Sequence, residues 1–167
     1  MWLDLMQLKH MHPLLSALTA AEYAHRAGLG LERHLHVPGV ALDAWNEDVA
    51  HEARLHWAGS PFGDFELHDW NRITEDAAEA IALALVHVAL GWVVRRRLQR
   101  GESADWLLQD RESSLVALEV SGVDTGDVTD RLRIKLGQVR RATIAKQRVA
   151  CVVELSTPRA KVAAAPP

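Results

Sequence analysis

The chain has 167 residues, of which 49% are hydrophobic and 25% charged, so we expect one folded domain with a substantial core. No segment reaches the roughly 18 apolar residues of a membrane span, and no basic stretch leads into a long apolar run at the N-terminus, which argues against membrane insertion and secretion. The single cysteine, Cys151, cannot form an internal disulfide, which favours a cytoplasmic protein and a packing role for this thiol.

The net charge of −3 is unevenly distributed along the chain. Residues 1–90 hold 5 lysines and arginines against 13 acids, a net charge of −8, whereas residues 91–167 hold 14 against 9, a net charge of +5. A basic C-terminal half is compatible with nucleic acid as a partner. An excess of this size is also common in proteins that bind no nucleic acid.

The N-terminal part of the chain combines an acidic composition with mixed local signals. Thr19 and Glu22 form a possible capping box, which predicts a helix from about residue 20 to the early thirties. The segment from residue 37 to 63 mixes short apolar runs with turn residues and predicts a pair of irregular strands. The tryptophans of this region could form an interface with a protein partner or with a second copy of the chain.

The second half of the chain predicts alternating helices and strands. Thr74, followed by two acids, is typical of a helix start, and residues 77–90 are apolar nearly all round, which predicts a buried helix. Strands are expected from Trp92, over 104–108 and over 115–120, the last two joined as a hairpin. Because both hairpin segments are almost continuously apolar, we expect a sheet that is covered on both faces.

The C-terminal part predicts one more helix and one more strand. Apolar residues recur at helical spacing from Asp127 to about Lys146, which predicts an amphipathic helix. A buried strand is expected over 148–155, and the Pro-containing and Ala-rich end of the chain is typical of a disordered tail. The predicted organisation is an acidic N-terminal extension (1–73), an α/β core (74–156) and a disordered tail (157–167).

Two acids stand at the ends of the predicted hairpin strands. Asp105 lies at the start of one strand and Glu119 near the end of the next. Adjacent strands lie about 4.8 Å apart, which suits two carboxylates that share one ion. Magnesium prefers hard oxygen ligands and keeps several waters, so two acids and a phosphate oxygen suffice to hold it. The spacing therefore predicts a two-carboxylate site for Mg²⁺ or Mn²⁺.

With these acids, the order helix, strand, strand, strand, helix, strand over residues 74–156 resembles the PD-(D/E)xK, or restriction-endonuclease-like, superfamily. The resemblance rests on element order, spacing and two short motifs, and it does not cover residues 1–73. It implies an α/β fold with a mixed β-sheet flanked by helices. In this superfamily the acids bind one or two divalent cations, usually magnesium, and a lysine two residues after the second acid helps to position or activate the attacking water.

Position by position, the resemblance makes Asp105 and Glu119 the metal ligands and Glu79 the auxiliary acid of the first helix. The lysine position holds Ser121, whose hydroxyl supplies neither positive charge nor a useful base near neutral pH. Some members carry the lysine on the following helix, where this chain has Lys135. The resemblance thus implies a candidate site of these five residues, with Lys135 as the substitute for the missing lysine.

Each of these roles has an alternative. Acids at strand ends are frequently solvated or paired with arginine, and Arg111 and residues 95–97 are close to the hairpin in the sequence. Glu79 is surrounded by apolar residues, so its charge needs a partner or a cleft, and a salt bridge with one of the arginines is the competing explanation. For Lys135, the default expectation is a solvated surface lysine.

The sequence therefore predicts a magnesium-dependent DNA phosphodiesterase of endonuclease type, in which basic residues after Gly91 guide the DNA backbone. The alternative is a nuclease-like domain without catalysis that serves as a binding or assembly subunit of a bacterial defence or DNA-processing complex. Ser121 favours the alternative, because the usual water-activating arrangement lacks its lysine. So does the acidic first half, which could dock onto a basic partner.

Overall fold

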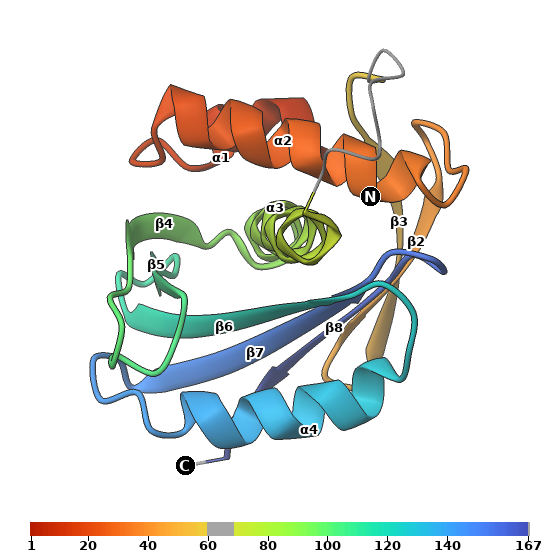
Figure 1. Cartoon of the computed structure of the whole chain (residues 1–167). Helices are drawn as coiled ribbons and strands as arrows, with labels where there is room; N and C mark the ends of the chain where they lie inside the picture. Colours follow the sequence, from red (N-terminus) through yellow and green to blue (C-terminus); the bar gives the residue numbers. More distant parts are fainter. Residues whose placement is uncertain (60–68, 167) are drawn as a thin grey trace.

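The computed structural model describes residues 1–59 and 69–166, which form one mixed eight-stranded sheet with helices on both faces (Figure 1). The strands are β1 (Trp2–Asp4), β2 (Ala41–Asn46), β3 (Val49–His56), β4 (Val93–Arg97), β5 (Trp106–Gln109), β6 (Leu115–Val123), β7 (Gln147–Glu154) and β8 (Arg159–Ala164). The helices are the 3-10 helix η1 (Leu5–Gln7) and the α-helices α1 (Leu8–Met11), α2 (Ala17–Glu32), α3 (Trp70–Leu90) and α4 (Val128–Val139). The predicted α/β class is confirmed.

The strand order across the sheet is β1-β3-β2-β8-β7-β6-β5-β4. Strands β4, β5 and β6 form an antiparallel meander, as the predicted hairpin requires, and β6 pairs in parallel with β7 after the crossover through α4. Strand β8 pairs antiparallel with β7 and parallel with β2. The hairpin of β2 and β3 then leads to β1, which pairs in parallel with β3.

Helix α3 is buried because it lies between α2 and the sheet (Figure 1). Residues on all its sides are buried, which confirms the prediction from its apolar composition. Its start was predicted at Thr74 and lies at Trp70, because the Asp69 carboxylate accepts the amides of Asn71 and Arg72 and caps the helix. Neither α3 nor any other helix in the described ranges is long and apolar enough to cross a bilayer.

Helix α2 begins three residues earlier than its predicted capping box. The Ser16 hydroxyl accepts the amide of Thr19, so Ser16 is the N-cap and Thr19 lies inside the helix. Two glycines allow close packing of this helix: a Cβ on Gly28 would lie 2.7 Å from the Trp57 ring, and one on Gly30 would lie 2.9 Å from Leu155. The glycines therefore fit the helix to β3 and β7 rather than ending it.

Helix α4 covers the other face of the sheet, against β6, β7 and β8 (Figure 1). Its buried residues include Leu132 and Val139, which belong to a second hydrophobic cluster separate from the one around α3. The helix ends at Val139, earlier than predicted, although Ala142 still packs into the same cluster. The expectation of a sheet covered on both faces holds for the strands on which the candidate site lies.

The C-terminal tail was predicted to be disordered, but residues 159–164 form the inner strand β8. Burial alternates along this strand. Ala160 and Val162 are buried in the hydrophobic cluster on the α3 side of the sheet, whereas Arg159 and Lys161 are partly exposed. Both edges of β8 are hydrogen bonded, one to β7 and one to β2. The small, weakly hydrophobic side chains of this segment do not indicate a strand in the sequence. The strand forms because it pairs with a neighbour on each side.

The N-terminal extension contributes three strands to the same sheet as the predicted core. The irregular strand pair expected from residue 37 is confirmed as the β2–β3 hairpin, and residues 60–63 of that prediction lie outside the described ranges. On the face away from α3, side chains of β1, β2 and β3 are exposed, including Trp2 and Trp45. These three strands carry the sheet beyond the area covered by α4.

Candidate functional site

The two predicted metal-ligand acids lie close together where β5 begins beside β6. Trp106, the first residue of β5, lies opposite Leu118, and the amide of the preceding residue, Asp105, donates to the Leu118 carbonyl at 3.0 Å. The Asp105 carboxylate accepts a hydrogen bond from the amide of Val120, the residue after Glu119, at 2.8 Å. The start of the hairpin therefore brings the two carboxylates near each other, and the charge of Glu119 acts on Asp105.

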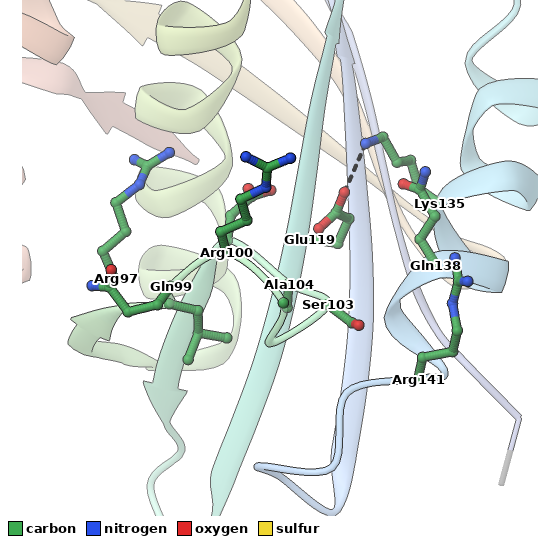
Figure 2. Close-up of a pocket in the computed structure, with 12 residues that line it drawn as sticks. Arg97, Gln99, Arg100, Ser103, Ala104, Glu119, Lys135, Gln138 and Arg141 are labelled. Atoms are coloured by element: carbon green, nitrogen blue, oxygen red, sulfur yellow. Dashed lines mark hydrogen bonds and ion pairs between the residues drawn. The ribbon is translucent and has the colours of Figure 1, made fainter.

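Both acids line a cleft of about 380 Å³ between the 97–105 segment and α4 (Figure 2). Four basic side chains line the same cleft: Arg97, Arg100, Lys135 and Arg141. In Figure 2, Arg97 and Arg100 lie on one side of Glu119, and Lys135 and Arg141 lie on the other. The lining carries four positive charges against two negative ones, so the cleft favours an anionic ligand.

Lys135 reaches the second acid from α4. Its Nζ donates to Glu119 Oε1 at 2.7 Å, and the two side chains are only 15% and 12% exposed. The packing of α4 over β6 makes this contact possible, since Lys135 and Glu119 lie on facing surfaces of the two elements. An ammonium therefore stands beside Glu119 although residue 121 is a serine.

Asp105 has an unusual protonation equilibrium for an aspartate. Burial, together with the negative charge of Glu119, raises its pKa from 3.8 to about 6. The Val120 amide donates to Asp105 Oδ2 at 2.8 Å and lowers the pKa, as do the charges of Arg97 and Lys135, but these effects are smaller in sum. The raised pKa reflects two carboxylates that share a poorly solvated position.

Ser121 lies two residues after Glu119 on β6 but is not part of the cleft lining. Its buried hydroxyl accepts a hydrogen bond from Arg131 Nε at 2.9 Å, so α4 also supplies the partner at this position. The predicted serine is therefore a contact between β6 and α4. The structure brings Asp105, Glu119 and Lys135 together and leaves Ser121 beside them.

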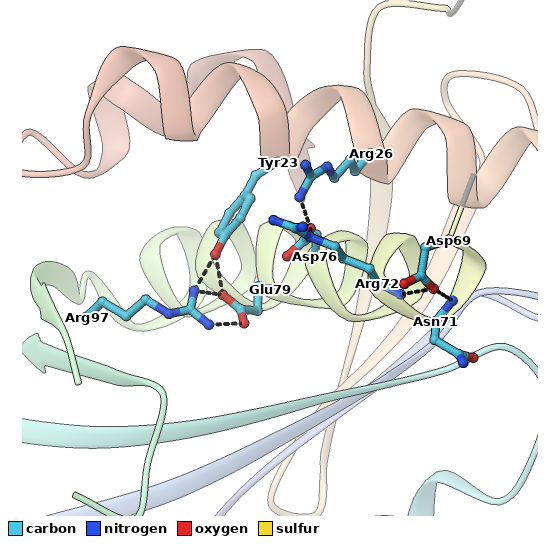
Figure 3. A network of polar contacts seen from close by, with 8 residues as sticks. All are labelled: Tyr23, Arg26, Asp69, Asn71, Arg72, Asp76, Glu79 and Arg97. Carbon is cyan, nitrogen blue, oxygen red and sulfur yellow. Dashed lines mark hydrogen bonds and ion pairs between the residues drawn. The ribbon is translucent and has the colours of Figure 1, made fainter. Parts of the chain in front are cut away.

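Glu79 does not join the acid pair. It lies on the α3 side of the sheet, where its buried carboxylate accepts hydrogen bonds from Arg97 and Tyr23 (Figure 3). The Trp106 indole also donates to it, at 3.0 Å. Trp106, the first residue of β5, contacts Glu79, whereas Asp105, the residue before it, lines the cleft with Glu119. Of the two roles considered for Glu79, the structure matches the arginine salt bridge.

Arg100, Arg141 and Gln138 also line the cleft and were not among the five predicted site residues. Arg100 lies in the turn between β4 and β5 and Arg141 follows the end of α4, so neither belongs to a periodic pattern. Gln138 lies one helical turn after Lys135, a spacing that the sequence does contain. Its Oε1 atom is buried and has no hydrogen-bond partner within residues 1–59 and 69–166.

The acid pair fits the requirements of magnesium better than those of zinc. Two carboxylates offer hard oxygen ligands, and the cleft has room for the waters that Mg²⁺ retains. Within the described ranges, no three His, Cys, Asp or Glu side chains form a cluster suited to a metal ion. The thiol of Cys151 is buried in β7, which raises its pKa to about 12 and makes it a packing residue.

No protein-family model, curated protein sequence or solved structure matches this chain.

Proposed function

We propose that this protein is a magnesium-dependent phosphodiesterase that cleaves DNA. The observation that carries the proposal is the position of Lys135, whose ammonium contacts Glu119 in a basic cleft that Asp105 also lines. Two acids and one lysine are the groups that the PD-(D/E)xK resemblance requires. Here the lysine comes from the helix after the second acid rather than from the position two residues beyond it.

The order of the elements around the cleft supports the proposal. Helix α3 is followed by the meander β4-β5-β6, by α4 and by β7, which pairs in parallel with β6. The resemblance implies this succession of helix, three strands, helix and strand. Asp105 directly precedes the second of these strands, Glu119 lies in the third, and Lys135 lies in the second helix.

Each charged residue of the cleft has a definite chemical task under this proposal. Asp105 and Glu119 would hold the Mg²⁺ ion, which when bound acidifies a water and offsets charge on the phosphoryl oxygens. Lys135 orients Glu119 and places a positive charge where negative charge develops on the phosphate. Arg97, Arg100 and Arg141 attract the phosphate backbone into the cleft.

A cleavage assay tests the proposal. Purified protein, incubated with Mg²⁺ or Mn²⁺ and single-stranded or double-stranded DNA, should cut at least one form, with RNA as the comparison substrate. Asp105→Ala should abolish cutting, because it removes a metal ligand. Asp48→Ala, at an exposed position between β2 and β3, is the matched control and should retain full activity. Absence of cutting by the wild-type protein with every substrate and both ions would refute the proposal.

A second candidate function, a nuclease-like binding or assembly subunit without catalysis, is favoured by three observations. Lys135 already forms an ion pair with Glu119, and Arg131 donates a hydrogen bond to the Ser121 hydroxyl. The exposed tryptophans Trp2 and Trp45 lie on the same sheet face as α4 but beyond the strands that α4 covers, which suits a protein partner or a second copy of the chain. Under this alternative the protein binds nucleic acid or a partner protein and cuts nothing, and light scattering of the purified protein measures whether it self-associates.

A further inference from the structure

Arg97 is held unusually firmly for a side chain that is 48% exposed. Its Nη1 donates to Glu79 Oε2 at 2.6 Å and its Nη2 donates to Glu79 Oε1 at 2.8 Å. The same Nη1 donates to the Tyr23 hydroxyl (Figure 3). The guanidinium also lies 5.0 Å from the centre of the Trp106 ring. Surface arginines rarely have their orientation determined by a buried carboxylate, so this one is preorganised before any ligand arrives.

The contacts with Glu79 and Tyr23 use only part of the guanidinium. Glu79 occupies the end of the group, between Nη1 and Nη2. The other side of the guanidinium carries Nε–H and the second Nη2–H. Neither of these two N–H groups has an acceptor among residues 1–59 and 69–166. These two parallel N–H groups form a second fork, with the geometry that binds two oxygens of a phosphate.

Arg97 stands at the boundary between two clefts, which differ in charge. One is the cleft of the acid pair (Figure 2), and the other, of about 570 Å³, lies between α2 and α3. The second cleft is lined by five acids and three arginines, and two of those arginines, Arg26 and Arg72, are paired with Asp76. A phosphate is therefore attracted to Arg97 from the side of the acid pair, where basic residues are in excess.

We propose that Arg97 binds a phosphate group of the nucleic-acid strand through its Nε–H and Nη2–H, beside the scissile phosphate held at Asp105 and Glu119, and that Glu79 and Tyr23 are its positioning residues. The identity of the ligand as nucleic acid rests on the proposed function. The arrangement gives Glu79 a task in the site although it lies on the opposite face of the sheet. It positions an arginine rather than a metal ion.

The test measures binding without cleavage, by fluorescence anisotropy of a labelled single-stranded oligodeoxynucleotide in the presence of EDTA. Arg97→Lys keeps the charge but loses the fork, so it should weaken binding about tenfold with an unchanged dependence on salt. Arg97→Gln should weaken it further and reduce the salt dependence by about one counterion. Arg133→Lys, on the outer side of α4 with an 80% exposed side chain, is the control and should bind as the wild type does.

A second measurement separates positioning from a merely structural role. The ¹H–¹⁵N signal of Arg97 Nε should shift when inorganic phosphate or the oligonucleotide is added to the wild-type protein. Glu79→Gln and Tyr23→Phe release the guanidinium, so both should weaken oligonucleotide binding severalfold. If either variant is too unstable to study, the other provides the result. A purely structural role would instead lower the unfolding temperature and leave both the binding and the Nε signal unchanged.

The outcomes distinguish this inference from the proposed function. Wild-type affinity in Arg97→Lys, or an Nε signal that responds to neither ligand, would overturn the inference while DNA cleavage still stands. If the wild-type protein binds neither DNA nor RNA at low salt, the proposed function fails and the inference fails with it. Weakened binding in Arg97→Lys together with normal binding in Arg133→Lys supports the inference, whether or not the protein cuts DNA.

Discussion

Glu119 and Lys135 form the ion pair from which the candidate site is built. Both side chains are largely removed from water, so each charge depends on the other. Removing one partner of such a pair typically costs about 3–5 kcal/mol, because the remaining charge is left without compensation. A Lys135 variant could therefore lose activity simply by unfolding, so its unfolding temperature must be measured together with its activity.

The pH dependence of stability tests the environment of Asp105. Its pKa in the folded protein, about 6, exceeds its ordinary value of 3.8, so the native state binds more protons between these values than the unfolded state does. The free energy of unfolding should therefore fall as pH rises through this window. Asp105→Asn removes the cost of the buried charge and should be more stable than the wild type above about pH 7.

Urea denaturation at a series of pH values measures this effect. Asp48→Asn, at an exposed position, should follow the wild-type profile. Parallel profiles for the wild type and Asp105→Asn would show that Asp105 is ordinarily solvated. Magnesium should raise wild-type stability well above pH 6 and lose this effect near pH 5, because protonated Asp105 is a poor ligand.

At the scale of elements, the distance between α3 and β6 depends on a glycine next to the site. A Cβ on Gly122 would lie 2.3 Å from the Thr74 carbonyl oxygen of α3. Gly122→Ala must therefore push the helix and strand apart, at a cost of about 1–3 kcal/mol in the free energy of unfolding. Denaturation by urea measures the cost, and any nuclease activity should fall as the register of β6 shifts.

Gly137 in α4 provides the matched comparison. A Cβ there would meet no atom within 4 Å, and this residue lies on the exposed side of the helix. Gly137→Ala should therefore stabilise the protein by about 0.5–1 kcal/mol, through helix propensity. Equal effects of the two substitutions would contradict the close contact between α3 and β6.

Elements with strong local signals were predicted from the sequence. The apolar run of α3 and the two hairpin strands β5 and β6 have patterns that are complete within a few residues. The starts of α2 and α3 were placed incorrectly, because Ser16 and Asp69 compete with later residues that also suit a cap. Strand β8 was missed because its order comes from β2 and β7, which are distant in the chain.

In the candidate site, too, local spacing was predictable from the sequence and contacts between distant segments were not. The hairpin spacing predicts that Asp105 and Glu119 lie together, whereas Lys135 was expected beside them only through the PD-(D/E)xK resemblance. The partner of Glu79 could not be chosen from the sequence, since three consecutive arginines occupy β4 and the strand register selects Arg97. Arg97 lies opposite Trp106, which directs both side chains toward Glu79.

At the scale of the molecule, the acidic and basic halves of the chain build one sheet. The strands β1, β3 and β2 of the acidic half lie at one side and the meander β4-β5-β6 of the basic half lies at the other, with β8 and β7 between them. Charges segregated along the chain are therefore also segregated in space. Basic residues surround the acid pair at one side of the sheet, and the exposed face of β1, β3 and β2 carries Asp43 and Glu52 on directly opposite positions.

Under the proposed function, Asp105 and Glu119 form a binding site for one divalent cation. Titration with Mn²⁺ at about pH 7.5, followed by the electron paramagnetic resonance signal of the free ion, tests it most directly. The wild-type protein and Glu112→Gln, at an exposed turn, should bind Mn²⁺ saturably and release it to excess Mg²⁺, whereas Glu119→Gln should bind none. Equal Mn²⁺ binding in all three proteins, or none in the wild type, would contradict the claim.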